Sequence, residues 1–198
     1  MKRIFDLTLL LILFPLILPI IIIFSFIIFI FQGRPVLFKQ DRLGKDHLRF
    51  KIIKFSSMTR DRGMDGELLP DKDRITRLGD FIRKTSVDEL PSLWNVLLGQ
   101  MSFVGPRPLR ERYLNRYSEE QDRRHEVKPG VTGWAQINGR NAVTWDKRFE
   151  LDVWYVDNQS FFLDLKILFS TIFVVLLRKD INLSDDVTME EFEGNHSN

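Results

Sequence analysis

The feature that most constrains this chain is an unbroken apolar segment near its start, from Ile4 to Phe31. Almost every residue in it is aliphatic or phenylalanine, and Asp6 is its only charged residue. About 20 apolar residues are enough for a helix to cross the hydrocarbon core of a bilayer, so we expect a membrane segment here. A cleavable signal peptide is the alternative. Its apolar region is about half as long, however, and ends in a small-residue cleavage site that we do not find here.

Two prolines and the flanking charges indicate how this segment sits in the bilayer. A straight helix of about 28 residues is roughly 42 Å long, which exceeds a hydrocarbon core of about 30 Å. Pro15 and Pro19 lie near its middle, where each removes a backbone hydrogen bond and favours a break. Cations, which are typical of cytoplasmic flanks, stand on both sides. They are Lys2 and Arg3 before the segment and Arg34, Lys39, Arg42 and Lys45 after it. We therefore expect a re-entrant helix-break-helix, with a kinked single-pass helix as the alternative.

After the membrane segment the sequence is polar and mixed, as in a globular domain. Two alternating apolar runs about Gly44 predict a short β-hairpin. Residues 59–73 are charged and contain two glycines and a proline, which predicts an exposed loop. Helices are expected over residues 74–84 and 87–98. The predicted fold class is therefore α+β and mainly helical, in a monotopic membrane-associated domain.

A further apolar stretch covers residues 161–177 but contains Asp164 and Lys166. Two charges make a spanning helix unfavourable, so we expect either a helix at the membrane interface or a core helix. The last residues are acidic and polar, and we expect them to be poorly ordered or lightly docked. The predicted parts are a membrane segment (1–32), a cytosolic catalytic domain with interfacial helices (33–183) and an acidic tail (184–198).

Charge and cysteine content exclude other classes of protein. The 29 Lys and Arg residues are nearly balanced by 27 Asp and Glu residues, and no basic stripe with interleaved aromatics is present. We therefore expect no nucleic-acid partner. The absence of cysteine fits a domain in the cytosol, where disulfides would not help it. The oligomeric state stays open, with a homo-oligomer among the alternatives.

Two adjacent carboxylates, Asp88 and Glu89, lie in the stretch TSVDELP just ahead of an apolar run. Ser86 and Glu89 have the spacing of a capping box, in which two side chains satisfy backbone amides at a helix start. That interpretation gives Asp88 no role. The helix dipole at such a position favours both an ionised aspartate and a bound phosphate. Asp88 is therefore a candidate for chemistry, while Glu89 could cap the helix, bind a metal, or do both.

Two other stretches have compositions that folding alone does not require. Gly105-Pro106-Arg107-Pro108 holds an arginine between prolines, and a rigidly held guanidinium suits phosphate. Residues 128–141 combine three glycines with side chains such as Gln136 and Arg140. Glycines allow a close backbone approach to a ligand, and these polar groups could contact a base or a sugar. A long turn between helices is the alternative for this second stretch.

Together these motifs resemble the small monotopic phosphoglycosyl transferases, a family of bacterial sugar transferases. The resemblance covers nearly the whole chain. Its motifs are KRIFD (2–6), KF (54–55), SVDELP (86–91), NVL (95–97), MSFVGPRP (101–108), RR (123–124), residues 128–141 and FELDV (149–153). It implies transfer of a phosphosugar, with an N-acetylated amino sugar favoured, from a UDP-sugar to polyprenol (undecaprenyl) phosphate, releasing UMP. The implied place is the cytoplasmic face of a bacterial inner membrane, at the start of glycoconjugate or polysaccharide assembly.

The same resemblance implies roles for individual residues. Asp88 is the expected nucleophile, which forms a covalent phosphosugar intermediate, and Mg²⁺ is the expected cofactor, with Asp88 and Glu89 as candidate ligands. Arg107 is expected to contact phosphate. Lys54 is a further candidate phosphate contact, with an ordinary solvated lysine as the alternative. A membrane-docked scaffold that keeps the fold without turnover is the alternative to an enzyme.

Overall fold

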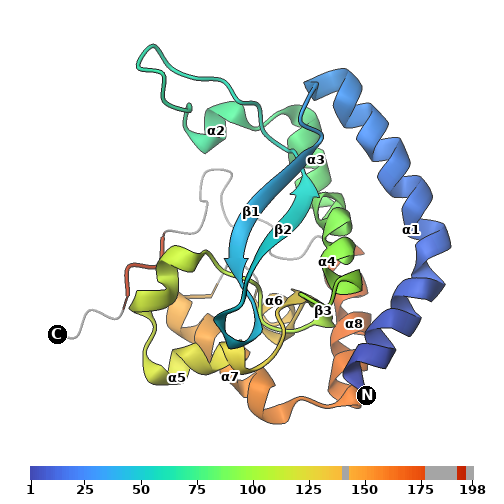
Figure 1. Ribbon diagram of the computed structural model, residues 1–198, viewed down its shortest axis with the longest axis vertical. Helices are drawn as coiled ribbons and strands as arrows, with labels where there is room; N and C mark the ends of the chain where they lie inside the picture. The colour runs from blue at the N-terminus through green and yellow to red at the C-terminus, as the bar shows by residue number, and fades with distance from the viewer. Residues whose placement is uncertain (140–142, 177–190, 195–198) are drawn as a thin grey trace.

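The computed structural model describes residues 1–139, 143–176 and 191–194 of the 198-residue chain. A long helix, α1 (Lys2–Gln32), precedes an antiparallel hairpin of β1 (Leu37–Leu43) and β2 (Arg49–Phe55), as Figure 1 shows. A second, parallel pair joins β3 (Ser102–Val104) to β4 (Gly130–Thr132). The other α-helices are α2 (Asp71–Arg74), α3 (Arg77–Lys84), α4 (Leu93–Leu97), α5 (Glu119–Asp122), α6 (Trp134–Ile137), α7 (Trp145–Asn158) and α8 (Phe161–Leu176). Short 3-10 turns are η1 (Lys45–His47), η2 (Val87–Ser92), η3 (Glu111–Arg116) and η4 (Arg123–Glu126). The expected class, a mainly helical α+β fold with one short hairpin, is confirmed.

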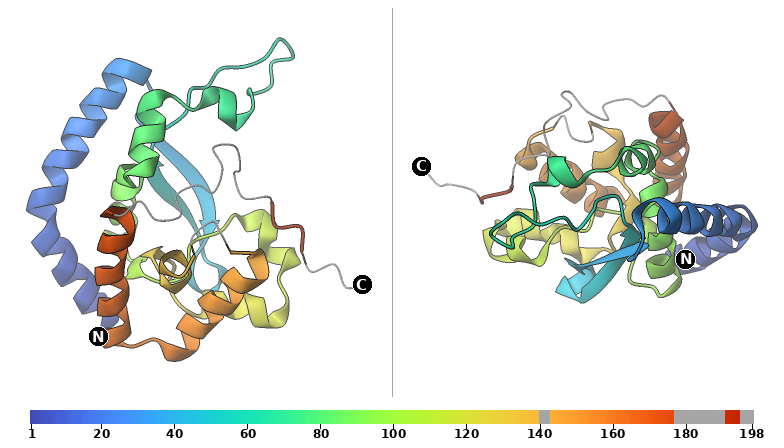
Figure 2. Two further views of the ribbon diagram at one scale, coloured as in Figure 1. Left: turned by 180° about the vertical axis from the view of Figure 1, so that it is seen from behind. Right: turned by 90° about the horizontal axis from the view of Figure 1, so that it is seen from above.

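The N-terminal segment is one continuous helix rather than the helix-break-helix expected from its prolines. Pro15 and Pro19 both lie inside α1, which is 31 residues long. Figures 1 and 2 show the helix bowed, with its middle farthest from the rest of the protein and both ends lying against it. Proline removes a backbone hydrogen bond without always breaking a helix, and bending is the common result. Among the described residues, α1 is the helix long and apolar enough to cross a membrane.

Polar side chains fasten the N-terminal end of α1 to the domain. The Asp6 carboxylate is 2% exposed and accepts hydrogen bonds from Ser102 Oγ (2.9 Å) and the Phe103 backbone N–H (3.1 Å). Arg3 donates to backbone carbonyls at the end of α4, and Lys2 pairs with Asp164 of α8. The single charge inside the apolar segment is thus an anchor between α1 and β3.

The other end of α1 is also docked, while the middle is not. Gln32 Nε2 donates to Thr76 Oγ1 at 2.9 Å, and Ile28 is buried with Phe55 and Ile82. Between these ends large apolar side chains face outward, and Leu11 is 74% exposed. A water-facing surface of this kind is unfavourable, so the exposed middle of α1 is consistent with the membrane location expected from the sequence.

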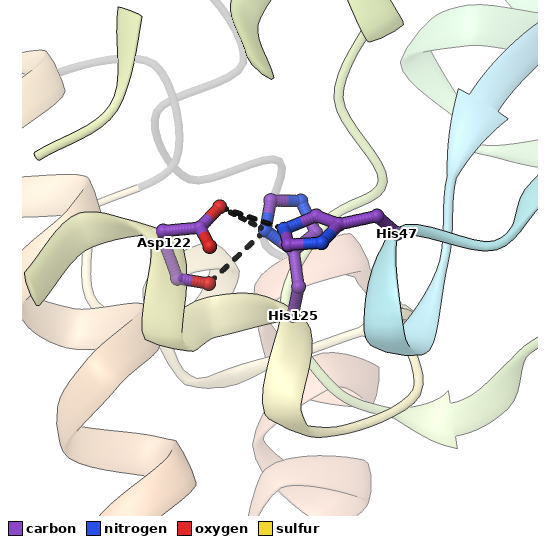
Figure 3. Close-up of side chains that lie close together, drawn as sticks. All are labelled: His47, Asp122 and His125. Carbon is purple, nitrogen blue, oxygen red and sulfur yellow. Dashed lines mark hydrogen bonds and ion pairs between the residues drawn. The ribbon is translucent and has the colours of Figure 1, made fainter. Parts of the chain in front are cut away.

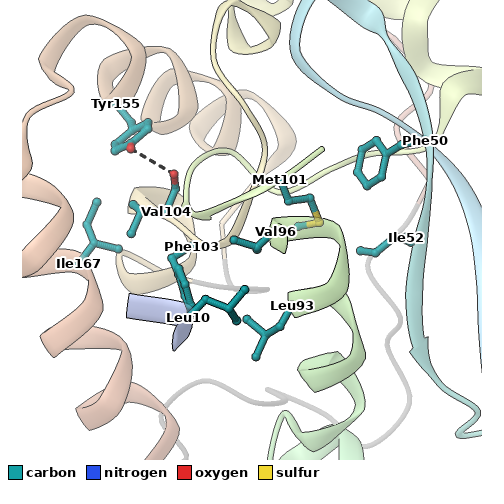
Figure 4. Close-up of a cluster of buried hydrophobic side chains, with 10 residues drawn as sticks. All are labelled: Leu10, Phe50, Ile52, Leu93, Val96, Met101, Phe103, Val104, Tyr155 and Ile167. Atoms are coloured by element: carbon teal, nitrogen blue, oxygen red, sulfur yellow. Dashed lines mark hydrogen bonds between the residues drawn. The ribbon is translucent and has the colours of Figure 1, made fainter. Parts of the chain in front are cut away.

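The main core lies where α1, β2, α4, β3, α7 and α8 meet. Figure 4 shows its buried side chains, which are Leu10, Phe50, Ile52, Leu93, Val96, Met101, Phe103, Val104, Tyr155 and Ile167. Side chains alternate between the two faces of a strand, so Phe50 and Ile52 reach the core from one face of β2. Lys54 continues the same alternation. The strand that contributes to the core therefore also directs a lysine toward the interior side of the hairpin.

Two of the expected helices are shorter than the apolar pattern predicts. The helix expected over residues 74–84 is α2 and α3, which Ile75 and Thr76 separate. The Thr76 hydroxyl accepts from the Gly79 N–H at 2.8 Å and starts α3 as its N-cap. The helix expected over residues 87–98 begins as the 3-10 turn η2 and becomes α-helical at Leu93.

Helix α8 is buried on one side and exposed on the other. Asp164 is buried and accepts from the Tyr155 hydroxyl at 2.6 Å, and the Lys166 ammonium lies over the Trp134 ring. Phe162, by contrast, is 80% exposed, and Phe173 also faces outward. Asp164 therefore helps to hold one face of α8 on the domain, whereas Lys166 lies on the exposed side of the helix with Phe162 and Phe173.

We expect Asp6→Ala to lower the free energy of unfolding by about 3 kcal/mol. The change leaves the Ser102 hydroxyl and the Phe103 N–H buried without partners. In a chain of this size the melting temperature should fall by roughly 6–12 °C in a thermal unfolding assay in detergent. Asp41→Ala, which removes an exposed carboxylate from β1, is the control and should change it little. Equal melting temperatures for both variants would contradict the anchoring role of Asp6.

Candidate active site

The capping box expected at Ser86 and Glu89 is not formed. Ser86 has a left-handed backbone (φ 57°, ψ 15°), and its side chain makes no capping hydrogen bond. Only backbone atoms join the two residues, through Glu89 N–H to the Ser86 carbonyl at 3.2 Å. The Glu89 side chain therefore does not cap η2 and is available for other contacts.

The structure brings four of the predicted site residues together at one point. The Lys54 ammonium lies 2.5 Å from Glu89 Oε1 and 3.9 Å from Asp88 Oδ2. Arg107 Nη2 donates to the same Glu89 Oε1 at 2.8 Å. Three separate segments, β2, η2 and the proline-flanked turn, supply these groups. Lys54, for which a solvated surface position was the alternative, lies inside this cluster.

The two carboxylates differ sharply in their surroundings. Burial raises the pKa of Asp88 to about 6, the neighbouring Glu89 charge acts in the same direction, and Lys54 opposes both. Burial also acts to raise the pKa of Glu89, but the Arg107 and Lys54 charges outweigh it and hold that pKa at about 2. The Glu89 charge in turn raises the pKa of Arg107. Glu89 is thus a permanent anion that binds two cations, whereas Asp88 can be protonated near neutral pH.

The Asp88 carboxylate also makes fewer polar contacts than the Glu89 carboxylate. Among the described residues none donates a hydrogen bond to its carboxylate, and Lys54 at 3.9 Å is its sole ion-pair partner. A carboxylate with few hydrogen bonds keeps its lone pairs available for a new bond. The arrangement can therefore supply a nucleophile beside cations that attract phosphate.

A buried ion pair holds the backbone that carries Arg107. Arg124 of η4 and Asp152 of α7 are each 2% exposed and pair at 2.8 Å. The same Arg124 Nη2 donates to the Arg107 carbonyl at 2.7 Å. Gly105 packs against the backbone of residues 128–130, where an added Cβ would lie 2.2 Å from the Lys128 carbonyl. Tight backbone packing and the Arg124 hydrogen bond together fix the turn from which Arg107 projects.

One residue of the site, Arg42, was expected only as a cation that flanks the membrane segment. In the hairpin, Arg42 is paired with Phe50, and Phe38 is paired with Lys54. The side chains of two directly paired residues lie on the same face of the sheet. Arg42 therefore projects from the same face as Lys54, and both line a small hollow with Glu89 and Arg107. The alternation of β1 about its Gly44 turn is the sequence signal that could have identified it.

Arg42 lacks a neutralising partner among the described residues. Its guanidinium donates to the Gln40 side chain and the Asp41 carbonyl, neither of which is charged. Burial, followed by the charges of Arg110 and Arg107, lowers the pKa of Arg42 to about 10, so it remains a cation near neutral pH. An unneutralised cation beside a small polar hollow favours an anionic ligand.

The glycine-rich stretch is more ordered than a loop and is only partly described. Residues 130–132 form β4 and residues 134–137 form α6, which packs on α7 and α8. Gln136 has its amide buried, with no hydrogen-bond partner for either amide atom among the described residues, and it does not line the hollow at Glu89. Arg140 lies outside the described residues.

The carboxylate pair has the chemistry of a magnesium site. Mg²⁺ takes oxygen ligands and commonly binds one or two carboxylates together with substrate phosphates. Asp88 and Glu89 both lie within 4 Å of the Lys54 ammonium, so their carboxylates face the same region. Glu89 Oε1 is occupied by two cations, which leaves the Asp88 oxygens and Glu89 Oε2 as the atoms that could hold the ion.

Comparison with known proteins identifies the family. Residues 1–178 match the model of the family described as bacterial sugar transferase. The chain belongs to the bacterial sugar transferase family. It is 54% identical over 194 residues to a protein of Bacillus subtilis (strain 168) named uncharacterized sugar transferase EpsL, covering 98% of this chain and 96% of that protein. The predicted resemblance and the expected enzyme class are confirmed at the level of this family.

Two more members of the family are longer than this chain. One is named UDP-glucose:undecaprenyl-phosphate glucose-1-phosphate transferase, from Klebsiella pneumoniae, and is 40% identical over 90% of this chain and 40% of that protein. The other is named UDP-N-acetylgalactosamine-undecaprenyl-phosphate N-acetylgalactosaminephosphotransferase, from Aeromonas hydrophila. It is 38% identical over 88% of this chain and 43% of that protein. The chain thus spans less than half of either protein but nearly all of the Bacillus relative.

We expect Asp152→Ala to lower the free energy of unfolding by about 3–5 kcal/mol, since it leaves the Arg124 guanidinium buried without its carboxylate. Asp157→Ala is the matched control, because it removes one of the three carboxylates that pair with the adjacent, partly exposed Arg123 and should change stability little. Denaturant unfolding of the two variants measures the difference. Similar losses in both would show that the buried pair does not support this part of the site.

Proposed function

We propose that this protein transfers a phosphosugar from a UDP-sugar to undecaprenyl phosphate at a membrane surface, with Asp88 as the nucleophile. The observation that carries the proposal is the contrast within the carboxylate pair. The Asp88 side chain is 13% exposed, accepts no hydrogen bond from the described residues and has a raised pKa, while Glu89 is ionised and pairs with Lys54 and Arg107. A scaffold that only docks on a membrane has no need of this contrast.

The reaction consists of two displacements at one phosphorus atom. In the first, an Asp88 carboxylate oxygen attacks the sugar-bearing phosphorus. The bond from this phosphorus to the oxygen bridging the two phosphates breaks, and its electron pair leaves with UMP. In the second, an oxygen of undecaprenyl phosphate attacks the same phosphorus and the bond to Asp88 breaks. This restores the carboxylate and gives undecaprenyl-diphosphosugar. A covalent intermediate divides one difficult displacement into two easier ones.

The cations of the site reduce the electrostatic repulsion between the Asp88 carboxylate and the anionic diphosphate of the donor. Arg107 and Arg42 both line the hollow and would hold phosphate oxygens of the donor, while Lys54 faces both carboxylates. Glu89 positions Lys54 and Arg107 rather than reacting itself. A Mg²⁺ ion bound by Asp88 and Glu89 would neutralise charge on the diphosphate. Fixed charges placed where new charge develops are a large source of rate enhancement.

The membrane part of the proposal is that α1 re-enters the bilayer from the cytoplasmic face. Its two ends dock on one domain, through Asp6 at one end and Gln32 at the other. A helix fastened in this way supports the topology that the charged flanks predict, in which both ends lie on one side. The proposed parts are the membrane segment (1–32), the catalytic domain (33–183) and the acidic tail (184–198).

The donor sugar is proposed to be an N-acetylated amino sugar. The relative from Aeromonas hydrophila is named for N-acetylgalactosamine, whereas that from Klebsiella pneumoniae is named for glucose. A panel of UDP-sugars therefore has to include both classes. Gln136 and Arg140 are proposed to contact the nucleotide or the sugar of the donor.

Asp88→Asn should abolish both UMP release and the covalent intermediate. The assay uses protein purified in detergent with Mg²⁺, undecaprenyl phosphate and a panel of UDP-sugars carrying a radiolabel in the sugar. Omitting the acceptor should leave label attached to the wild-type chain. Asp80→Asn, which alters an exposed carboxylate of α3, is the control and should behave as wild type. Normal turnover by Asp88→Asn would overturn the mechanism, and an absence of turnover in the wild type with every donor would favour the scaffold.

The rate of intermediate formation should depend on a group with a pKa of about 6. Asp88 attacks only when ionised, and its pKa is raised to about 6, so the rate at low donor concentration should be constant above about pH 7 and should fall on acidification. Below the pKa the fall should approach tenfold per pH unit. Single-turnover labelling without acceptor measures this step alone, because the donor diphosphate stays ionised throughout. A rate that remained constant down to pH 4.5 would contradict a role for a shifted carboxyl group.

Loss of either arginine proposed to hold the donor phosphates should slow UMP release by about a hundredfold, the scale for one preorganised charge-stabilising group. We expect this for Arg107→Ala and for Arg42→Ala, with only partial recovery in Arg42→Lys, since lysine lacks the guanidinium fork. Arg49→Ala is the matched control, because Arg49 lies on the outer face of the same hairpin and is exposed. A rate within twofold of wild type would show that the substituted arginine does not hold the donor phosphates.

A further inference from the structure

Away from the carboxylate pair, a second cluster brings two imidazoles and a carboxylate together (Figure 3). His47 lies in η1 at the tip of the hairpin, Asp122 ends α5, and His125 lies in η4. Asp122 Oδ1 is 2.8 Å from His47 Nε2 and 3.2 Å from His125 Nδ1. All three atoms lie within 4.8 Å of one another, and both rings are turned toward the carboxylate.

The hairpin tip holds His47 in this position at a conformational cost. Asp46 and His47 have φ angles of 52° and 59°, in the left-handed region that residues other than glycine seldom adopt. The side chains of His47 and Asp122 are 40% and 36% exposed, and exposed pairs of this kind contribute little to stability. One half-exposed hydrogen bond and a ring contact with His125 are weak reasons for this turn. A ligand that bonds to all three side chains is a stronger one.

We propose that His47, Asp122 and His125 bind a divalent transition-metal ion, for which Zn²⁺ has the matching chemistry. Two imidazole nitrogens and one carboxylate oxygen form a donor set that suits zinc and related ions rather than Mg²⁺. Bonds of about 2.0–2.2 Å in a tetrahedral site place ligand atoms about 3.4 Å apart. The two separations from Asp122 Oδ1, 2.8 and 3.2 Å, need to grow by only a few tenths of an ångström, and the two imidazole nitrogens already lie within 4.8 Å of each other. His47 and Asp122 are exposed enough to move by this amount, and a fourth position remains for water.

The ion would join two parts of the chain that carry the candidate active site. The hairpin with His47 at its tip carries Arg42 on β1 and Lys54 on β2. Arg124, next to His125, holds the Arg107 backbone. Leu43 and Gly44 from the hairpin and His125 from η4 line a shared crevice that reaches Arg107. A metal bridge at this place would hold the two walls of the site at a fixed separation. The inference does not depend on the reaction proposed above, since its ligands are separate from Asp88 and Glu89.

Calorimetric titration with ZnCl₂ tests the proposal on the full-length protein in detergent, stripped of metal and purified without a histidine tag. Millimolar Mg²⁺ is present throughout, so that oxygen-only sites are occupied. The chain has three histidines and no cysteine, so CoCl₂ should give the visible bands of a nitrogen- and oxygen-ligated ion, with no thiolate charge-transfer band. His47→Gln removes one ligand from an exposed position. His196→Gln makes the same substitution at the third histidine and is the matched control.

We expect one Zn²⁺ per chain in the wild type and in His196→Gln, and an affinity at least tenfold lower in His47→Gln. Zinc at about a hundred times its dissociation constant should raise the wild-type melting temperature by about 5 °C or more and should not raise that of His47→Gln. Without metal the two should melt alike. Asp122→Asn is the second variant and should show the same loss. Equal zinc binding by wild type and both variants, or no binding by the wild type, would overturn the proposal.

Discussion

The arrangement of the candidate site depends on one carboxylate, that of Glu89, which accepts from two cations brought by two other segments. Lys54 comes from the hairpin and Arg107 from the proline-flanked turn, and both contact the same Glu89 oxygen. Buried like charges repel, so Lys54, Arg107 and Arg42 could not line one hollow without an anion among them. Because Glu89 takes this role, the Asp88 carboxylate beside it accepts no hydrogen bond from the described part of the chain. The different surroundings of Asp88 and Glu89, rather than their residue types, thus give the two carboxylates different roles.

Much of this could be predicted from the sequence, because the strongest signals are local. The apolar segment from Ile4 to Phe31, the alternation about Gly44 and the prolines around Arg107 each specify structure within a few residues. The motifs also identified Asp88, Glu89, Lys54 and Arg107, and the structure places these four side chains together. What the sequence could not decide was the role of Glu89, since a helix cap and a metal ligand can occupy the same position. The left-handed backbone of Ser86, whose side chain makes no capping hydrogen bond, rules out the capping box, and Glu89 pairs with Lys54 and Arg107 instead.

The features that were missed are those that depend on distant contacts. Arg42 was interpreted from its neighbours along the chain, as part of a charged flank, and its place in the site follows from strand register across the hairpin. The parallel pairing of β3 with β4 joins residues 102–104 to residues 130–132 and has no local signature. The continuous course of α1 is a similar case. Local rules favour a break at Pro15 and Pro19, whereas contacts at the two ends of the helix decide its overall path.

The two attachments of α1 also restrict how the domain can move. A protein tethered by one flexible point can tilt and swing, so its reactive groups sample a range of heights above a bilayer. Here Asp6 and Gln32 fasten the helix near both of its ends, and α8 presents an outward apolar face. In the proposed membrane arrangement, the two attached ends of α1 and the apolar face of α8 would give three supports, which define a plane. The carboxylate pair would then be held at one height and one tilt, so that an acceptor diffusing within the membrane would meet it by a two-dimensional search.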